Sequence, residues 1–290
     1  SLFLLSSQIQ ADPSKVQMTR DWRTIMLFPV PSLIYLVHNN VQFSTLQYVD
    51  PSTYQIMGNL KIVTTGLLFR LILRRQLSKL QWIALLLLTV GATTSQVAGC
   101  GDSALSAPME GYALGVLSAC LSALAGVYTE YVMKRVDDNL YWQNVQLYGF
   151  GVLFNGARLV MDDVNAGFHN GFSLFPSVML QGYDGVTFLV VLNLAFTGLL
   201  VSWIMKFADS IVKVYSTSMA MVVTMALSVF IFGIAPTLQM TLGIITASCS
   251  LLLYYMSPAD LSPEAAKQAP AAASNVRVDL PDPEEKNAED

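Results

Sequence analysis

Charged residues are scarce in this chain of 290 residues, because Asp, Glu, Lys and Arg together make up only 12% of it. An ordinary soluble domain carries about 25%. Hydrophobic residues make up 53%, and the mean hydropathy is +0.50. These values exclude an ordinary soluble domain. No nucleic-acid partner is expected either, since 16 basic residues stand against 20 acidic ones.

Cysteine and recognisable catalytic motifs are also lacking. The three cysteines, Cys100, Cys120 and Cys249, are too few and too widely spaced for a disulfide framework or a zinc site. No Walker loop or nucleophile elbow occurs in the sequence. We therefore expect no metal, no cofactor and no enzymatic activity.

Apolar residues, in contrast, are abundant and come in blocks of about 20 residues, the length that crosses roughly 30 Å of hydrocarbon. Blocks such as Trp82–Leu88 are apolar on every side, as a lipid-embedded helix is, whereas a β-barrel strand alternates. The sequence predicts an all-α, polytopic bundle of membrane helices. Eight intact spans are visible, at residues 25–48, 52–73, 80–98, 110–133, 140–161, 185–205, 210–233 and 236–256.

Segments of other composition flank this transmembrane domain of residues 25–256. Residues 1–24 begin with a short apolar stretch, which we interpret as the stump of a missing helix followed by a cytosolic loop. Residues 257–290 are rich in Pro, Ala and acidic residues and are predicted to form a disordered cytosolic tail. Lys and Arg collect in alternate loops, and this distribution places both ends of the chain in the cytosol.

Lys61 is the most informative charge in the sequence. Asp50 and Pro51 suit the N-cap and first turn of the second span, which places Lys61 about ten residues in, or roughly 15 Å deep. An ammonium at that depth must face a wet cavity, an acidic partner or an anion. Tyr54 lies on the same face, and Gly58 leaves an opening between the two.

A second informative lysine, Lys213, lies near the start of the seventh span. Lys213 lies in the first turn, where the helix dipole is positive, so an anionic ligand is predicted to approach it. Ser210 or Asp209 can cap the helix, and the run Tyr215, Ser216, Thr217 and Ser218 offers hydroxyl donors to phosphate or sugar oxygens. Ser210 and Ser216 are the candidate substrate contacts among them. The two lysine-bearing spans are five apart and cross the membrane in opposite directions, as inverted repeats around a central site require.

Each lysine can also be explained by an ion pair within the protein instead of a bound ligand. Lys61 can form a buried ion pair with Glu130 or Asp209, and Lys213 can pair with Asp209 at i,i+4. Glu130 is itself predicted to pair with Lys134 at the cytosolic end of the fourth span.

Small and polar residues inside the spans give further predictions. Small residues recur on one face of the fourth span and are predicted to let helices approach closely: Gly111, Gly115, Ser118, Ser122 and Gly126. The set Gly149, Gly151 and Gly156 in the fifth span gives the same prediction. In the first span, the run from Tyr35 to Gln42 contains His38, Asn39 and Asn40. Consecutive residues cannot share one face, so only one or two of these line a cavity.

Five ordered motifs across residues 25–256 resemble the Golgi nucleotide-sugar transporters of the CMP-sialic acid and UDP-galactose branch, and plant CMP-sialic acid transporter-like proteins among them. The motifs are Val30–Tyr35 leading to Asn39 and Asn40, Tyr54 and Gln55 with Leu60 and Lys61, Leu77–Trp82, Gly126–Glu130, and Asp209–Lys213. The resemblance implies a ten-helix fold of the drug/metabolite transporter type with inverted repeats, of which the first one to two helices are lacking here. It also implies exchange of a nucleotide sugar for a nucleoside monophosphate across the Golgi membrane.

Carried over residue by residue, the resemblance makes Lys61 and Lys213 the phosphate contacts. Asn39 and Tyr54 line the nucleotide pocket, and Gln55 shares the Tyr54 motif. A CMP-sialic acid-like substrate is the first expectation, and UDP-galactose or UDP-N-acetylglucosamine is the alternative. A truncated, non-transporting partner of a full-length transporter is the alternative of another class. The sequence leaves open a homo-oligomer and an endoplasmic reticulum location.

Overall fold

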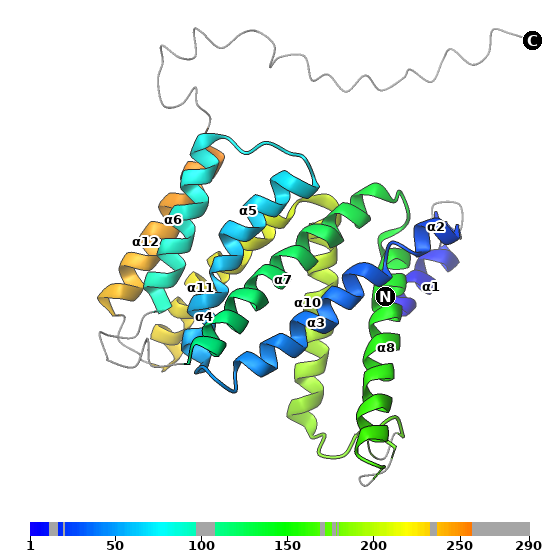
Figure 1. Ribbon diagram of the computed structural model, residues 1–290. Helices are drawn as coiled ribbons and strands as arrows, with labels where there is room; N and C mark the ends of the chain where they lie inside the picture. Colours follow the sequence, from blue (N-terminus) through cyan, green and yellow to red (C-terminus); the bar gives the residue numbers. More distant parts are fainter. Residues whose placement is uncertain are drawn as a thin grey trace, which may run out of the picture.

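The computed structural model describes residues 1–11, 17–19, 21–96, 108–168, 172–175, 178, 180–232 and 237–256. Across these residues the chain is a bundle of α-helices without strands (Figure 1). The helices are α1 (Leu2–Ala11), α2 (Trp22–Ile25), α3 (Pro29–Thr45), α4 (Pro51–Gly58), α5 (Leu60–Ile72), α6 (Lys79–Gln96), α7 (Met109–Arg135), α8 (Leu140–Asn165), α10 (Gly185–Phe207), α11 (Ser210–Phe232) and α12 (Leu238–Tyr255).

Over the described residues, each predicted span contains a helix along most of its length, so the predicted all-helical bundle is confirmed. The second span is not one helix, because α4 ends at Gly58 and α5 begins at Leu60. Among the described residues, α7, α10 and α12 are the helices long and apolar enough to cross a membrane by length and composition. The predicted tail of residues 257–290 lies outside the described residues.

Local sequence explains where two of the helices begin. The Asp50 carboxylate accepts a hydrogen bond from the Thr53 backbone N–H at 3.0 Å and caps α4, as predicted, with Pro51 in the first turn. The Asp184 carboxylate caps α10 in the same way, at 2.7 Å from the Thr187 N–H. The backbone N–H and the hydroxyl of Thr187 stabilise the charged form, and they hold the pKa of the Asp184 carboxyl below its ordinary value.

Glycine lets α6 and α12 pack with their backbones in contact, and Figure 1 shows the two helices side by side. A Cβ atom on Gly91 would lie 2.8 Å from the backbone oxygen of Gly243, and one on Gly243 would lie 2.6 Å from the oxygen of Gly91. Neither position has room for a side chain, so this helix pair forms a rigid edge of the bundle.

The predicted close packing of the fourth span is confirmed at Gly111 and Gly115 but not at Gly126, whose Cβ atom would have no contact shorter than 3.7 Å, and that of the fifth span is wrong. A Cβ atom on Gly111 would lie 2.8 Å from Tyr48, and one on Gly115 would lie 2.2 Å from the Met57 methyl group. In α8, by contrast, a Cβ atom on Gly149, Gly151 or Gly156 would have no atom within 4 Å. Glycine spacing alone did not reveal whether a helix faces a neighbour or open space.

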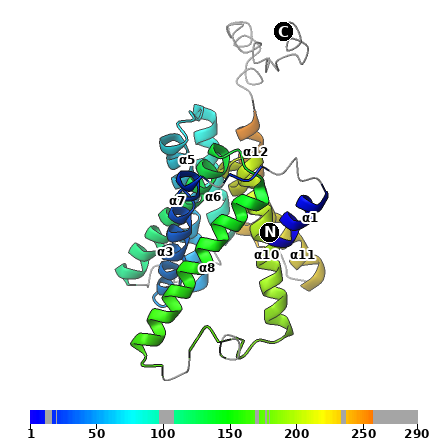
Figure 2. The same cartoon turned by 90° about the vertical axis from the view of Figure 1, so that its right-hand side faces the viewer.

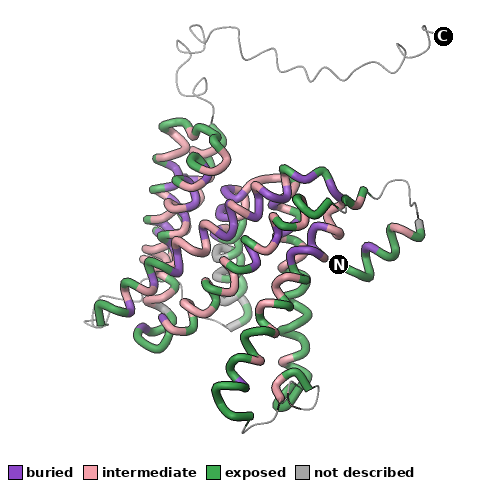
Figure 3. The backbone as a smooth tube through the Cα atoms, turned by 45° about the vertical axis from the view of Figure 1, so that its right-hand side comes forward, coloured by how far each residue is buried: buried purple, intermediate pink, exposed green. Residues whose placement is uncertain are grey.

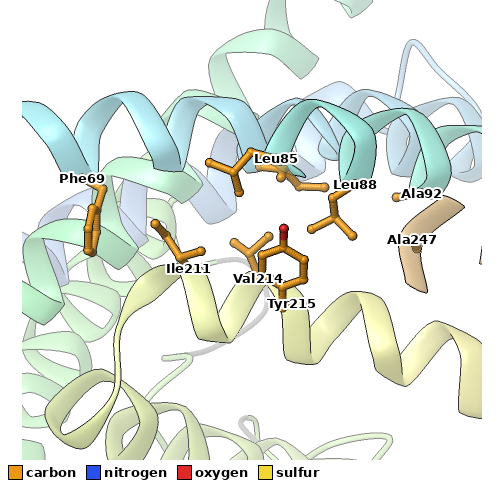
Figure 4. Close-up of a cluster of buried hydrophobic side chains, with 9 residues drawn as sticks. Phe69, Leu85, Leu88, Ala92, Ile211, Val214, Tyr215 and Ala247 are labelled. Atoms are coloured by element: carbon orange, nitrogen blue, oxygen red, sulfur yellow. The ribbon is translucent and has the colours of Figure 1, made fainter. Parts of the chain in front are cut away.

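Two clusters of buried apolar side chains hold the bundle together, and the first fixes the helices that carry the two lysines. Ile62 follows Lys61 on α5, while Ile211 and Val214 flank Lys213 on α11, and all three belong to this cluster. Figure 4 shows most of the first cluster, in which side chains of α6 face those of α11 and Phe69 of α5 lies beside them. Its members are Ile62, Phe69, Leu85, Leu88, Ala92, Ile211, Val214, Tyr215 and Ala247, and those of the second are Phe28, Val132, Met133, Leu147 and Met205.

Helices α8 and α10 extend beyond the rest of the bundle and diverge toward the connection that joins them (Figures 1 and 2). The residues at the far ends of α8 and α10 are mostly exposed. Buried residues lie mainly in the part of the bundle where the other helices pack together (Figure 3). On α10, Val186, Phe188 and Leu189 are all more than half exposed. An apolar helix with such a surface requires a hydrocarbon environment.

Candidate functional site

Three adjoining cavities lie between the helices, and the lysines connect them. The first, called lobe A, has a volume of about 600 Å³ and is lined by α3, α4, α7 and α11, among others. The second, called lobe B, has about 660 Å³ and lies between α3, α8 and α10. A space of about 50 Å³, called the lysine chamber, is lined by both Lys61 and Lys213. Lys61 also lines lobe A, and Lys213 also lines lobe B.

The break between α4 and α5 places Lys61 at the chamber. Lys61 is the second residue of α5, and Asn59 is the residue at the break. The side chain of Asn59 is buried and donates hydrogen bonds to the Gln96 side-chain oxygen at 3.1 Å and to the Thr93 hydroxyl at 3.4 Å. These bonds attach the break to α6, so Lys61 starts from a fixed point of the backbone.

Lys213 is positioned by the start of α11. The Glu130 carboxylate accepts a hydrogen bond from the Ser210 backbone N–H at 2.6 Å, and the Asp209 carboxylate accepts one from Val212 N–H at 2.8 Å. Both bonds satisfy N–H groups of the first helical turn. Gly126 on α7 lies next to the ammonium, and a Cβ atom there would make an ordinary van der Waals contact with Lys213 Nζ at 3.8 Å.

Neither lysine has a carboxylate partner within 4.0 Å among the described residues. Glu130 is fully buried and forms its ion pair with Lys134 at 2.7 Å, which confirms the predicted pair. The alternatives that pair Lys61 with Glu130 or Asp209, and Lys213 with Asp209, are therefore wrong. The residues that line the two lobes and the lysine chamber, all within the described part of the chain, include no Asp or Glu.

The other predicted site residues divide between the two lobes. Tyr54 and Gln55 line lobe A, whereas Asn39 lines lobe B. His38 precedes Asn39 on α3 but lines lobe A. Tyr54 and Asn39 therefore line different cavities. One ligand can contact both residues only if it extends from lobe A through the lysine chamber into lobe B.

The hydroxyl groups of α11 are mostly engaged elsewhere. Ser210 lines the chamber, while its hydroxyl lies 3.5 Å from the Met205 sulfur. Ser216 is exposed and is not among the residues that line these cavities, so the structure does not bring it to the site. Thr217, one residue later, lines both lobe A and the chamber. Tyr215 turns away and contacts the Ser250 hydroxyl at 2.9 Å.

Sequence reasoning missed a polar chain that crosses lobe A. The Tyr54 hydroxyl lies 3.0 Å from the Ser118 hydroxyl, which lies 3.4 Å from His38 Nδ1. The sequence shows Ser118 only as a small residue in a packing stripe. It also gives no signal for Tyr148 and Asn155 of lobe B, because both lie in an uncharged stretch of the fifth span.

Comparison with known proteins gives a family match for most of the chain. A family model described as nucleotide-sugar transporter matches residues 7–255. "CMP-sialic acid transporter 1" of Oryza sativa subsp. japonica is 61% identical over 260 residues, which cover 88% of this chain and 80% of that protein. The protein of the same name from Arabidopsis thaliana is 60% identical over 261 residues, covering 89% and 76%.

A more distant relative and a solved structure extend the comparison. "CMP-sialic acid transporter 4" of Arabidopsis thaliana is 41% identical, over 84% of this chain and 67% of that protein. A crystal structure with 16% sequence identity superposes with a TM-score of 0.60 and covers 88% of this chain and 84% of the other. At this identity the superposition supports the fold alone.

Proposed function

Because this chain belongs to the nucleotide-sugar transporter family, and is therefore a polytopic membrane transporter and not an enzyme, we propose that it exchanges a nucleotide sugar for a nucleoside monophosphate. The observation that carries the proposal is the lysine chamber. Two ammonium groups line one small space whose described lining includes no carboxylate. The group that neutralises them is then the phosphate of the ligand.

Electrostatics supports a phosphate at this position. A unit charge 4 Å from an ammonium gains about 4 kcal/mol at the effective dielectric constant of a protein surface, and the gain is larger in a drier site. Two lysines on separate helices double this attraction and offset the desolvation of the phosphate. Lys61 and Lys213 are the proposed phosphate contacts, and Thr217 and Ser210 line the same space.

The two lobes fit the two halves of a nucleotide sugar. Lobe B combines the aromatic rings of Tyr35 and Tyr148 with the amides of Asn39 and Asn155, which suit a planar base with donors and acceptors on its edge. Lobe A is lined by many hydrogen-bonding side chains, including Gln42, Gln55 and Gln96, and suits a polyhydroxylated sugar. We assign the base to lobe B and the glycosyl half to lobe A.

A CMP-sialic acid-like ligand is the proposed substrate, since the similar plant proteins carry that name. UDP-galactose or UDP-N-acetylglucosamine is the alternative, because a phosphate site does not select the base. The proposed location is the Golgi membrane, or alternatively the endoplasmic reticulum, with both ends of the chain in the cytosol.

Exchange follows from charge. We propose alternating access around a fixed central site. An empty carrier must then enclose two unpaired ammonium groups in the low-dielectric centre of the membrane, whereas a loaded carrier encloses them neutralised. A ligand shifts a conformational equilibrium only by its difference in affinity for the two states. Reorientation is therefore favoured when either the nucleotide sugar or the monophosphate is bound, and ATP is not required.

The test is uptake of labelled CMP-sialic acid and UDP-galactose into proteoliposomes that contain the purified chain. Preloading with CMP is expected to stimulate uptake of CMP-sialic acid, and preloading with UMP to stimulate uptake of UDP-galactose if that is the substrate. Lys61→Ala is expected to abolish uptake without reducing insertion. Equal uptake with empty and preloaded vesicles would refute exchange.

A further inference from the structure

Gly58 is a glycine in lobe A whose missing side chain leaves empty space. A Cβ atom there would have no atom within 4 Å, and Gly58 lines lobe A between Tyr54 and Lys61. Tyr54 lies one turn before it on α4, and Lys61 lies three residues after it on α5. The opening thus lies beside the path from the lysine chamber into lobe A.

Packing does not explain glycine at this position. A Cβ atom on Gly91 would lie 2.8 Å from backbone atoms of Gly243 and Ala247, so that position needs glycine for close approach. Gly58 meets no such neighbour, and its φ is not in the left-handed region that favours glycine. A glycine with helical backbone angles lowers stability relative to alanine, and no neighbouring atom requires one at position 58.

The backbone that carries Gly58 is held in place. The next residue, Asn59, is buried and bonded to Gln96 and Thr93 of α6. Its backbone N–H bonds the Ile56 oxygen at 3.1 Å, and its backbone oxygen accepts from the Ile62 N–H at 3.0 Å. A side chain at residue 58 would start from this anchored backbone, in open space at the wall of lobe A.

We propose that Gly58 determines specificity by size: the space at its missing side chain admits the glycosyl half of the ligand. The inference rests on the proposed function, which places the phosphate between Lys61 and Lys213 and the glycosyl half in lobe A. A nucleoside monophosphate has no glycosyl group and leaves this space empty. Side chains of increasing size at residue 58 then act against the nucleotide sugar and spare the monophosphate.

The experiment measures ligand-induced stabilisation of the purified full chain in detergent, with CMP and CMP-sialic acid and with UMP and UDP-galactose as probes. The variants are Gly58→Ala, Gly58→Leu and Gly58→Phe. The matched control is Gly156→Phe on α8, where a Cβ atom also has no atom within 4 Å but which is not among the residues that line the three cavities.

The inference is tested by the affinity for the nucleotide sugar divided by the affinity for the monophosphate, measured for each variant. We expect this ratio to fall in the order Gly, Ala, Leu, Phe, by about tenfold or more for Phe, which corresponds to about 1.4 kcal/mol or more. Gly156→Phe is expected to keep the wild-type ratio. The small Ala variant keeps the series informative if Phe prevents folding.

Two other outcomes overturn the inference in distinguishable ways. If the wild-type chain binds both kinds of ligand and the ratio is unchanged across the Gly58 series, or if both affinities fall together, Gly58 does not select the glycosyl half. If the wild-type chain is stabilised by none of the four probes, the proposed function fails, and the inference fails with it.

Discussion

The Glu130 carboxylate is expected to be the most sensitive single group for the stability of the bundle. It is fully buried, its ion pair with Lys134 measures 2.7 Å, and its second oxygen accepts the Ser210 N–H at 2.6 Å. Lys134 also bonds the backbone oxygen of Ala208. One side chain therefore joins α7 to the start of α11, the helix that carries Lys213.

Glu130→Ala leaves a buried N–H and a partly buried ammonium without their acceptor. Removing one partner of a buried pair typically costs about 3–5 kcal/mol. Glu130→Gln keeps an oxygen for the Ser210 N–H and loses the charge, so we expect about half of that cost. Replacing both partners, as in Glu130→Leu with Lys134→Met, is expected to recover part of the loss, because no unpaired charge remains.

The assay is thermal unfolding of the purified chain in detergent, and α8 provides the control. Arg158 and Asp162 form an i,i+4 pair at 3.5 Å whose side chains are 49% and 58% exposed. Asp162→Ala is expected to change stability by less than about 1 kcal/mol. Equal effects of Glu130→Ala and Asp162→Ala would refute the reasoning that burial and the bond to Ser210 make Glu130 structural.

Two further predictions concern packing and the helix break. Gly91→Ala is expected to destabilise the chain by about 1–3 kcal/mol, because its Cβ atom would meet the Gly243 oxygen at 2.8 Å. Gly156→Ala, which meets nothing within 4 Å, is expected to be neutral or to stabilise by up to about 1 kcal/mol. A destabilised Gly156→Ala in the same melting assay would contradict this. Asn59→Leu removes the bonds that hold the break to α6, and we expect about tenfold weaker CMP binding. Wild-type affinity in a titration of that variant would show that the break needs no such support.

Much of the fold follows from the apolar blocks, because a helix in hydrocarbon must satisfy every backbone hydrogen bond within itself. Asp50 and Pro51 predicted the start of α4, and the spacing of Glu130 and Lys134 predicted their ion pair. The break at Asn59 was not predicted. It depends on hydrogen bonds to a helix more than thirty residues away in the sequence, and no local signal contains that information.

The sequence indicates the charged residues of the candidate site, but it does not indicate which neutral residues line it. Lys61 and Lys213 stood out because ammonium groups inside apolar spans are costly. Neutral residues give no such signal: His38 and Asn39 are adjacent and line different lobes, and Thr217 lines the site while Ser216 does not. A span that is apolar on every side has no periodicity that tells which residue faces a cavity. The rotation of each helix had to come from the structure.

The central claim is that one phosphate binds both lysines. The most direct measurement compares the affinities for CMP and cytidine, and for UMP and uridine, in the wild-type chain, Lys61→Ala and Lys213→Ala. We predict that the wild-type chain prefers the phosphorylated ligand and that each substitution reduces this preference by about tenfold or more, or about 1.4 kcal/mol. A preference for CMP over cytidine that survives in either variant would contradict the claim.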